Sequence, residues 1–164
     1  EAGFGEIGNL LEQVRLKDAL EQALSLSREV NQWLDSREPW KTIKVDETDA
    51  ARSVYAALQC IDNLKTLFAP FVPFSSQKVH EYLGYDGQLF GEQKIETYDE
   101  ETRSHKGLVY DGSKAIGKWE KTNLKQGQAL RQPAPLFTKL DPEIVDFESG
   151  FLGQPRDEQP IVVE

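Results

Sequence analysis

The chain has 164 residues, of which 38% are hydrophobic and 29% are charged, so it can form about one domain with a substantial core. No apolar run approaches the ~20 residues that a membrane-spanning helix needs, which argues against a membrane protein. The net charge of −9 argues against broad, sequence-independent binding of nucleic acid, because that mode uses many lysines and arginines to neutralise phosphates. A local patch could still recognise a polyanion.

The cysteine and methionine content bears on the protein's compartment and completeness. The chain contains one cysteine, Cys60, and no methionine. A single cysteine can form neither an intramolecular disulfide nor a cysteine-based zinc site, so we expect a cytoplasmic protein. The first residues, EAGFGEIGNL, have neither the basic nor the apolar region of a signal peptide. We therefore expect a fragment of a longer protein.

The first 36 residues carry two apolar stripes with helical spacing. Residues 7–14 place Ile and Leu side chains at i, i+3 and i+4, and residues 16–34 repeat this spacing on a stripe that does not continue the first. We therefore expect a bend near Arg15. The second helix should run to about Ser36, and Pro39 should end it, because proline lacks an N–H donor and restricts the residue before it.

The clearest helical stripe lies between Ala51 and Phe68. The acidic stretch 46–49 precedes it and offers capping side chains to the helix N-terminus. Prolines 70 and 73 should close this helix, and a shorter one should follow and end at Gly84.

From Tyr85 onward no segment sustains a helical period. Residues 94–98 and 107–110 could form short strands with a turn at Asp111-Gly112, and a helical turn could follow Pro142. The expected buried anchors of this region are Trp119, Leu136, Phe137 and Leu140. The fold class that we predict is all-α. It comprises an up-and-down helical bundle at residues 1–84 and a long, mostly irregular C-terminal extension at residues 85–164, which packs back on the bundle and has a mobile end.

Residue types that carry catalysis occur without the spacing that catalysis needs. His80 and Glu81 begin the sequence HEYLG, which lacks the second histidine of a zinc-protease helix four residues on. GxxxxGK[ST] is absent, so we expect no phosphate-binding loop. Cys60 falls inside a helix, where a partly buried thiol is more common than a nucleophile. We therefore expect no catalytic residue, no cofactor and no metal in this fragment.

Three motifs make the sequence resemble a known family. They are NQWLDSREPWK at residues 31–41, LFAPFVPFSSQKVHEYLG at residues 67–84 and APLFTKLD at residues 134–141. Together they resemble the C-terminal anticodon-binding domain of bacterial methionyl-tRNA synthetase, a class I aminoacyl-tRNA synthetase, over roughly residues 7–141. The middle motif is shared with other class I synthetases, whereas PLFxKLD points to the methionine enzyme.

The resemblance implies a role for Trp40. In the family, the tryptophan after the proline stacks on the first base of the CAU anticodon, and Trp40 occupies its place. Anticodon bases are single-stranded and can be splayed outward, so each stack on an aromatic face contributes ~1–3 kcal/mol. The alternative for Trp40 is a half-buried indole that packs on Pro39 at the helix end, and the two roles are compatible.

The neighbours of Trp40 complete the expected site. Arg37, Lys41 and Lys44 flank it and could meet phosphates of the anticodon stem, although simple solvation is the alternative for each. Asn31 falls on the inner stripe of its helix, so we expect a buried side chain that bonds a neighbouring helix or the loop holding the indole. Trp33, near the inner stripe of the same helix, is expected to lie in the core or to pack against a helix. Asn31, Trp33 and Pro39 would thus support the site.

The resemblance also implies what the fragment lacks. The family's catalytic domain, with its nucleotide-binding signatures, and an upstream helix whose asparagine and arginine read the anticodon are not in this sequence. The fragment is therefore expected to recognise tRNA-Met without catalysis, beside the catalytic domain of a parent enzyme that uses ATP and Mg, and away from any membrane. Two alternatives stay open: the anticodon domain of a leucine, isoleucine or valine synthetase, and a helical protein-interaction module.

Overall fold

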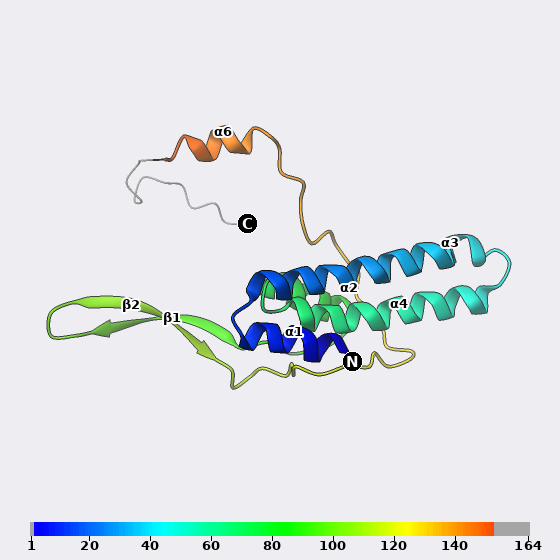
Figure 1. Ribbon diagram of the computed structural model, residues 1–164, viewed down its shortest axis with the longest axis horizontal. Coiled ribbons are helices and arrows are strands. Elements are labelled where there is room, and N and C mark those ends of the chain that lie inside the picture. The colour runs from blue at the N-terminus through cyan, green and yellow to red at the C-terminus, as the bar shows by residue number, and fades with distance from the viewer. Residues whose placement is uncertain (1, 153–164) are drawn as a thin grey trace. The chain divides into compact units, whose positions relative to one another are not determined.

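The computed structural model describes residues 2–152, and the end of the chain that we expect to be mobile lies outside this range, from residue 153 on. The chain divides into two compact units, Glu1–Pro133 and Ala134–Glu164. The helices described in the first unit are α1 (Ala2–Glu12), α2 (Leu16–Arg37), α3 (Pro39–Thr42), α4 (Glu47–Phe68) and α5 (Pro73–Tyr82). Figure 1 shows α1, α2 and α4 side by side, with α3 joining α2 to α4. The helices predicted from the apolar spacing are confirmed.

The core of the first unit lies where α1 and α2 pack near the end of α4. Its buried members are Ile7, Ala19, Ala23 and Leu67, which are 0–3% exposed. The two alanines share one face of α2, and small side chains there let neighbouring helices approach closely. The bend expected near Arg15 is confirmed, because residue 14 takes a left-handed φ of 59° and α2 runs back along α1.

Capping side chains and prolines set the limits of α4 and α5. The Asp46 side chain accepts a hydrogen bond from the Asp49 backbone N–H at 2.9 Å, so it caps the first turn of α4. Pro73 occupies the first position of α5, where a backbone N–H would have no partner within the helix. Gly84 follows α5 with φ 84°, a left-handed conformation that glycine adopts without strain.

The prediction of an all-α fold is confirmed only in part, because the structure is mostly helical but residues 92–111 form a β-hairpin. Strand β1 (Glu92–Asp99) pairs antiparallel with β2 (Ser104–Asp111), in a register that places Ile95 opposite Leu108. The expected turn at Asp111-Gly112 is wrong, since residues 100–103 connect the strands and Asp111 ends β2. Most side chains on both faces of the hairpin are exposed, so the apolar alternation that marks a half-buried strand is weak.

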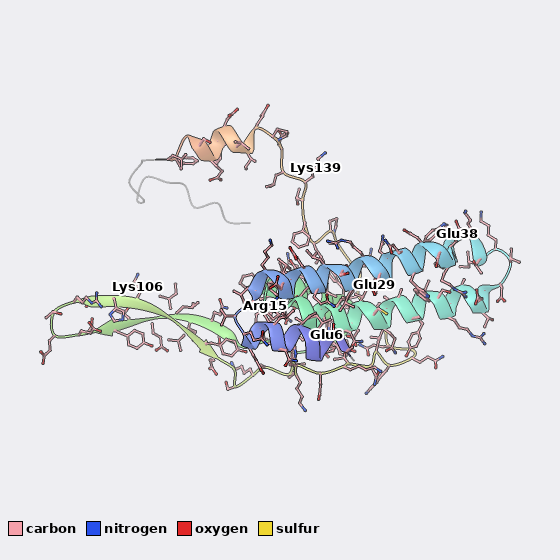
Figure 2. All side chains as sticks on the ribbon, viewed as in Figure 1. Glu6, Arg15, Glu29, Glu38, Lys106 and Lys139 are labelled. Carbon is pink, nitrogen blue, oxygen red and sulfur yellow. The ribbon has the colours of Figure 1, made fainter. Side chains whose placement is uncertain are left out.

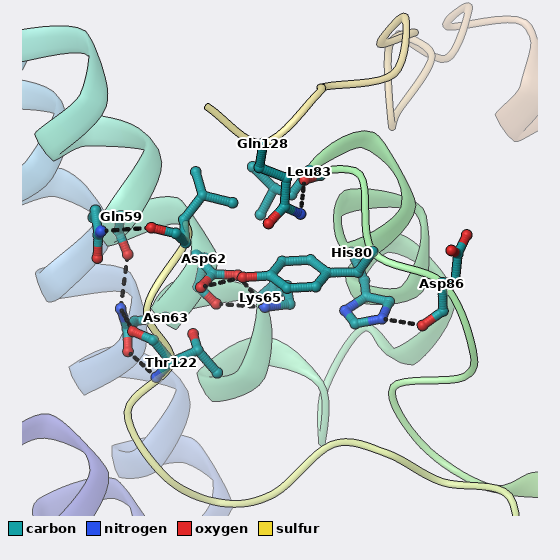
Figure 3. Close-up of polar contacts among 11 residues, drawn as sticks. Gln59, Asp62, Asn63, Lys65, His80, Leu83, Asp86, Thr122 and Gln128 are labelled. Carbon is teal, nitrogen blue, oxygen red and sulfur yellow. Dashed lines mark hydrogen bonds and ion pairs between the residues drawn. The ribbon is translucent and has the colours of Figure 1, made fainter. Parts of the chain in front are cut away.

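After the hairpin, polar side chains of α4 hold an irregular segment along the helix (Figure 3). The Tyr55 hydroxyl and the Gln59 amide both donate to the Leu124 carbonyl, at 2.7 and 3.0 Å. The Asn63 amide donates to the Thr122 carbonyl at 3.2 Å and accepts from the Thr122 N–H at 3.0 Å. Leu124 is only 3% exposed, so this segment belongs to the packed structure although it has no regular elements.

The second unit contains α6 (Ile144–Ser149), which confirms the helical turn expected after Pro142. Two expected anchors there are wrong, because Phe137 and Leu140 are exposed. The third, Leu136, is only partly buried. In the first unit, Trp119 keeps part of its surface exposed and donates from its indole N–H to the Phe4 carbonyl at 2.9 Å.

Within residues 2–152, no helix combines the length and the apolar character needed to cross a membrane.

Candidate nucleic-acid interface

The chain reverses direction between α2 and α4 through α3, at the end of the helices that Glu38 marks in Figure 2. Helix α2 ends at Arg37, and Glu38 takes left-handed angles of φ 43° and ψ 52°. Pro39 is then the first residue of α3. The predicted end of α2 is confirmed within one residue, but the mechanism differs. The left-handed Glu38 breaks the helix, and Pro39 starts a new turn.

This arrangement leaves Trp40 at the surface. Pro39 is buried, whereas Trp40 is 52% exposed. No stacking partner of the indole occurs among residues 2–152. Ile43 and Val45 follow in the same connection and are also exposed. Sequence reasoning missed these two, because they lie outside the helical stripes, and they add apolar surface to the tip.

Arg37 joins the end of α2 to the start of α4. Its Nη2 lies 2.8 and 3.0 Å from the two carboxylate oxygens of Asp49, and its Nε donates to the Ser53 hydroxyl at 3.3 Å. Ser53 is 3% exposed, so the guanidinium reaches from the surface to the packed face of α4. Arg37 therefore fixes the two helix ends that carry α3 between them.

The two lysines near Trp40 differ in their partners. Lys41 forms an ion pair with Glu38, three residues before it. Lys44 is exposed and has no ion pair among the described residues. Arg52, near the start of α4, is likewise exposed and unpaired within that range, and the sequence motif did not single it out. Lys44 and Arg52 are thus the cations of this region that are available to an anion.

Two of the expected supporting residues do not face the core. Asn31 is exposed, and no hydrogen bond of its side chain occurs among the described residues, so the prediction of a buried asparagine is wrong. Trp33 is 39% exposed, so it is not one of the buried core residues, and the alternative of packing against a helix stays open. The buried face of α2 is centred on Ala19 and Ala23, and at ~100° per residue Asn31 lies about 80° around the helix from Ala23.

A second cluster of ionisable groups lies between α4 and α5 (Figure 3). Lys65 and Asp62 form a buried ion pair, with side chains 2% and 0% exposed. The Tyr85 hydroxyl donates to the other Asp62 oxygen at 3.0 Å, and the lysine ammonium lies 4.7 Å from the centre of the tyrosine ring. The His80 ring stacks on the Tyr85 ring, with ring centres 4.8 Å apart.

Burial shifts the pKa values of this cluster, yet the geometry does not favour catalysis. Burial lowers the pKa of Lys65, with the Asp62 carboxylate opposing that shift. Burial, reinforced by Asp62, raises the pKa of Tyr85 to about 12. Structural ion pairs perturb pKa values as catalytic sites do. The charged atoms of Lys65 and Asp62 bond each other and are closed to solvent, so we assign the cluster to the junction of α4 and α5.

Neither the glycines of α1 nor the acidic and histidine side chains of the described residues form a ligand site. Gly3, Gly5 and Gly8 have the GxGxxG spacing of dinucleotide-binding loops, which sequence reasoning overlooked, but all three lie inside α1 rather than in a loop before a helix. Among residues 2–152, no group of three or more histidine, cysteine, aspartate or glutamate side chains could hold a metal ion.

Comparison with known families identifies the domain. The family described as the anticodon binding domain of methionyl tRNA ligase matches residues 4–111. The chain belongs to this family. The resemblance drawn from the three sequence motifs is thereby confirmed, and the exposed Trp40 and its neighbours lie within the matched range of the anticodon-binding domain.

Relatives of the anticodon-binding domain carry the same name. The chain is 47% identical to a methionine–tRNA ligase of Chloroflexus aurantiacus over 147 residues, which cover 89% of the chain and 24% of that protein. It is 43% identical over 153 residues to a methionine–tRNA ligase of a Roseiflexus species and 41% identical over 149 residues to that of Thermomicrobium roseum, each covering 90% of the chain and 25% of the relative. The chain therefore spans about a quarter of the length of these curated relatives.

Proposed function

We propose that this anticodon-binding domain recognises the CAU anticodon of tRNA-Met, with Trp40 stacking on the first anticodon base. The observation that carries the proposal is the half-exposed indole, which follows the buried Pro39 in the chain and has no stacking partner in the described part of the chain. A preformed aromatic face of this kind suits an unstacked base, because every base offers a π-face.

The surrounding cations would act on the backbone of the anticodon stem. Lys44 and Lys41 follow Trp40 in the chain, and Lys44 has no competing carboxylate among residues 2–152. We propose that these lysines meet phosphates, assisted by Arg52, whereas Arg37 positions the turn through Asp49 and Ser53. A protein with a net charge of −9 can bind RNA in this way, since the contacts are confined to a small patch.

We further propose that the parent protein is a methionine–tRNA ligase that activates methionine with ATP and Mg in the cytoplasm. The names of the relatives support this, as does the quarter of their length that the chain spans. The domain would contact the parent's catalytic domain and would itself supply no catalytic residue or cofactor site. In this proposal, residues 1–84 form an up-and-down helical bundle and residues 85–164 extend it.

The test is a titration of the parent protein with a labelled CAU anticodon stem-loop. Trp40→Ala should weaken binding by about 5- to 150-fold, which corresponds to the ~1–3 kcal/mol of one base stack. Trp40→Phe should retain part of the affinity, because a smaller aromatic ring still stacks. The matched control is Trp33→Ala, which removes another partly exposed indole, near the end of α2, and should leave binding unchanged.

Each contrary result has a distinct meaning. Equal binding by wild type and Trp40→Ala would remove the assignment of Trp40. Tighter binding of a stem-loop with a leucine, isoleucine or valine anticodon would assign the domain to another class I synthetase. Failure of the parent to bind any tRNA would favour a protein-interaction module.

A further inference from the structure

The β-hairpin and α5 form an open groove away from Trp40. The groove has a volume of about 710 Å³, within the range of binding sites for small ligands and peptide side chains. Its apolar lining is Phe74 of α5, Phe90 before β1, and Ile95 and Leu108 of the strands. Figure 1 shows the hairpin and α3 at opposite ends of the packed helices of the first unit. The groove is thus separate from the candidate RNA site.

The apolar groups of this groove are unusually open. Phe74 and Ile95 are each 72% exposed, and Leu108 is 68% exposed. The rings of Phe74 and Phe90 lie in an edge-to-face arrangement, with ring centres 6.4 Å apart. Scattered exposed apolar residues are normal on protein surfaces, but here they line one continuous hollow, which is typical of an interaction site.

The two faces of the hairpin differ in how they are covered. Ile95 and Leu108 are directly opposite each other and so share one face. The other face carries Tyr98, which stacks on His105 across the strands at 5.6 Å and lies against Gly107. Tyr98 thus has an aromatic partner on its own face, whereas the side chains of Ile95 and Leu108 remain open to the groove.

The charge around the groove selects the kind of partner. The ionisable residues that line it are Glu81 and Glu92, with the amides Gln77 and Gln93 beside them, and no lysine or arginine contributes to this lining. Glu92 is partly neutralised by Lys94 at 3.3 Å, while Glu81 accepts only the Gln77 amide, at 2.9 Å, among the described residues. An acidic lining disfavours RNA, and it disfavours the same surface of a second copy.

We propose that this groove binds a polypeptide segment that presents apolar side chains flanked by lysine or arginine. The apolar side chains of the segment would cover Phe74, Ile95 and Leu108, and its cations would lie near Glu81 and Glu92. Exposed strands suit such a partner, since an extended segment that lies across them places every second side chain against one face. The domain then has a protein-binding surface besides its RNA-binding end.

The test uses a fluorescein-labelled peptide of alternating leucine and lysine, titrated against the 164-residue chain by anisotropy. We expect saturable binding that weakens at least tenfold in the double variant Ile95→Thr/Leu108→Thr, and also in Phe74→Ser. The matched control is Val109→Thr, which makes the same type of change on the opposite face of β2 and should alter the affinity less than twofold. Glu81→Gln/Glu92→Gln should weaken binding at low salt and reduce its salt dependence.

Four outcomes would overturn the proposal. These are absence of saturable binding, equal binding of a leucine-glutamate peptide, displacement of the peptide by the CAU stem-loop, and a dimer in sedimentation that the double variant abolishes. The third would make the groove an RNA surface, and the fourth would make its partner a second copy. Circular dichroism of each variant checks that a loss of binding does not reflect loss of the fold.

Discussion

Arg37 lies beside the turn that carries Trp40, but its guanidinium is already occupied by Asp49 and Ser53. Sequence reasoning placed it among the phosphate-binding residues because it flanks the tryptophan. Its partners lie 12 and 16 residues away on another helix, and no local pattern in the sequence encodes such a pairing. Asn31 shows a second limit of sequence-based prediction. The predicted centre of the apolar stripe of α2 was slightly displaced around the helix, and this displacement was enough to assign an exposed residue to the buried side.

We predict that Arg37→Lys lowers the affinity for the CAU stem-loop about three- to tenfold, because a lysine ammonium cannot bond both Asp49 oxygens and Ser53 at once. If Arg37 positions the turn, the slope of log affinity against log salt concentration should stay as in wild type. Lys44→Ala, which removes a cation proposed to meet phosphate, should reduce that slope by about one unit. Equal slope changes in both variants would return Arg37 to the phosphate contacts.

His80 makes the stability of the domain depend on pH. It is 4% exposed, and burial lowers its pKa below the usual 6.5, assisted by the nearby Lys65 charge and opposed by the hydrogen bond to the Asp86 carbonyl and by the Asp62 and Glu81 charges. The ring Nδ1 is buried without a partner in the described structure, so a proton added there would find no acceptor.

The direction of this dependence follows from the lowered pKa. Below pH 6.5 the unfolded chain protonates its histidine before the folded chain does, so the stabilisation present above pH 6.5 is lost as the pH falls toward the folded pKa. We predict that His80→Phe, which keeps an aromatic ring against Tyr85, loses less unfolding free energy than wild type between pH 7.5 and pH 5.5 in urea titrations. The same loss in both proteins would contradict this role of His80.

At the scale of elements, the sequence predicts the helices, because each has a repeating pattern of apolar residues within its own segment. Helices α1, α2, α4 and α5 follow from apolar residues with a period near 3.6, because each buries one stripe. The strands expected at residues 94–98 and 107–110 lie within β1 and β2, but the hairpin is exposed on both faces, so its weak alternation predicted neither the full length of the strands nor the connection at residues 100–103. The segment around Leu124 is held by side chains of α4 that donate hydrogen bonds to its backbone. Every residue type has a backbone carbonyl, so the sequence of the segment does not reveal these bonds.

The junction after α5 depends on a glycine. Gly84 has φ 84°, and a Cβ atom there would lie 2.1 Å from the Ala129 carbonyl oxygen. Gly127 has a similar φ of 80°, but a Cβ there would have open space. We predict that Gly127→Ala costs about 1 kcal/mol of unfolding free energy for the left-handed backbone alone. Gly84→Ala should cost clearly more in the same urea titrations, because the segment at Ala129 must also move.

At the scale of the whole molecule, the helices and the segment beyond the hairpin form one packed unit up to residue 133. The segment contributes the buried Leu124, and its backbone is bonded to Tyr55, Gln59 and Asn63. It also reaches α5, where the residue 131 backbone N–H donates to the Tyr82 carbonyl at 2.9 Å. The predicted bundle of residues 1–84 therefore omits the segment beyond the hairpin, whose hydrogen bonds connect α4 and α5.

We predict that a chain ending at residue 112 is less stable than one ending at residue 133 by several kcal/mol. Exposing the Leu124 pocket costs about 2 kcal/mol, and each lost side-chain hydrogen bond to the segment costs about 1 kcal/mol. Urea titrations followed by circular dichroism give both free energies, and the chain ending at residue 133 should unfold in one cooperative transition. Equal midpoints and slopes for the two chains would mean that α4 and α5 do not depend on the segment for their stability.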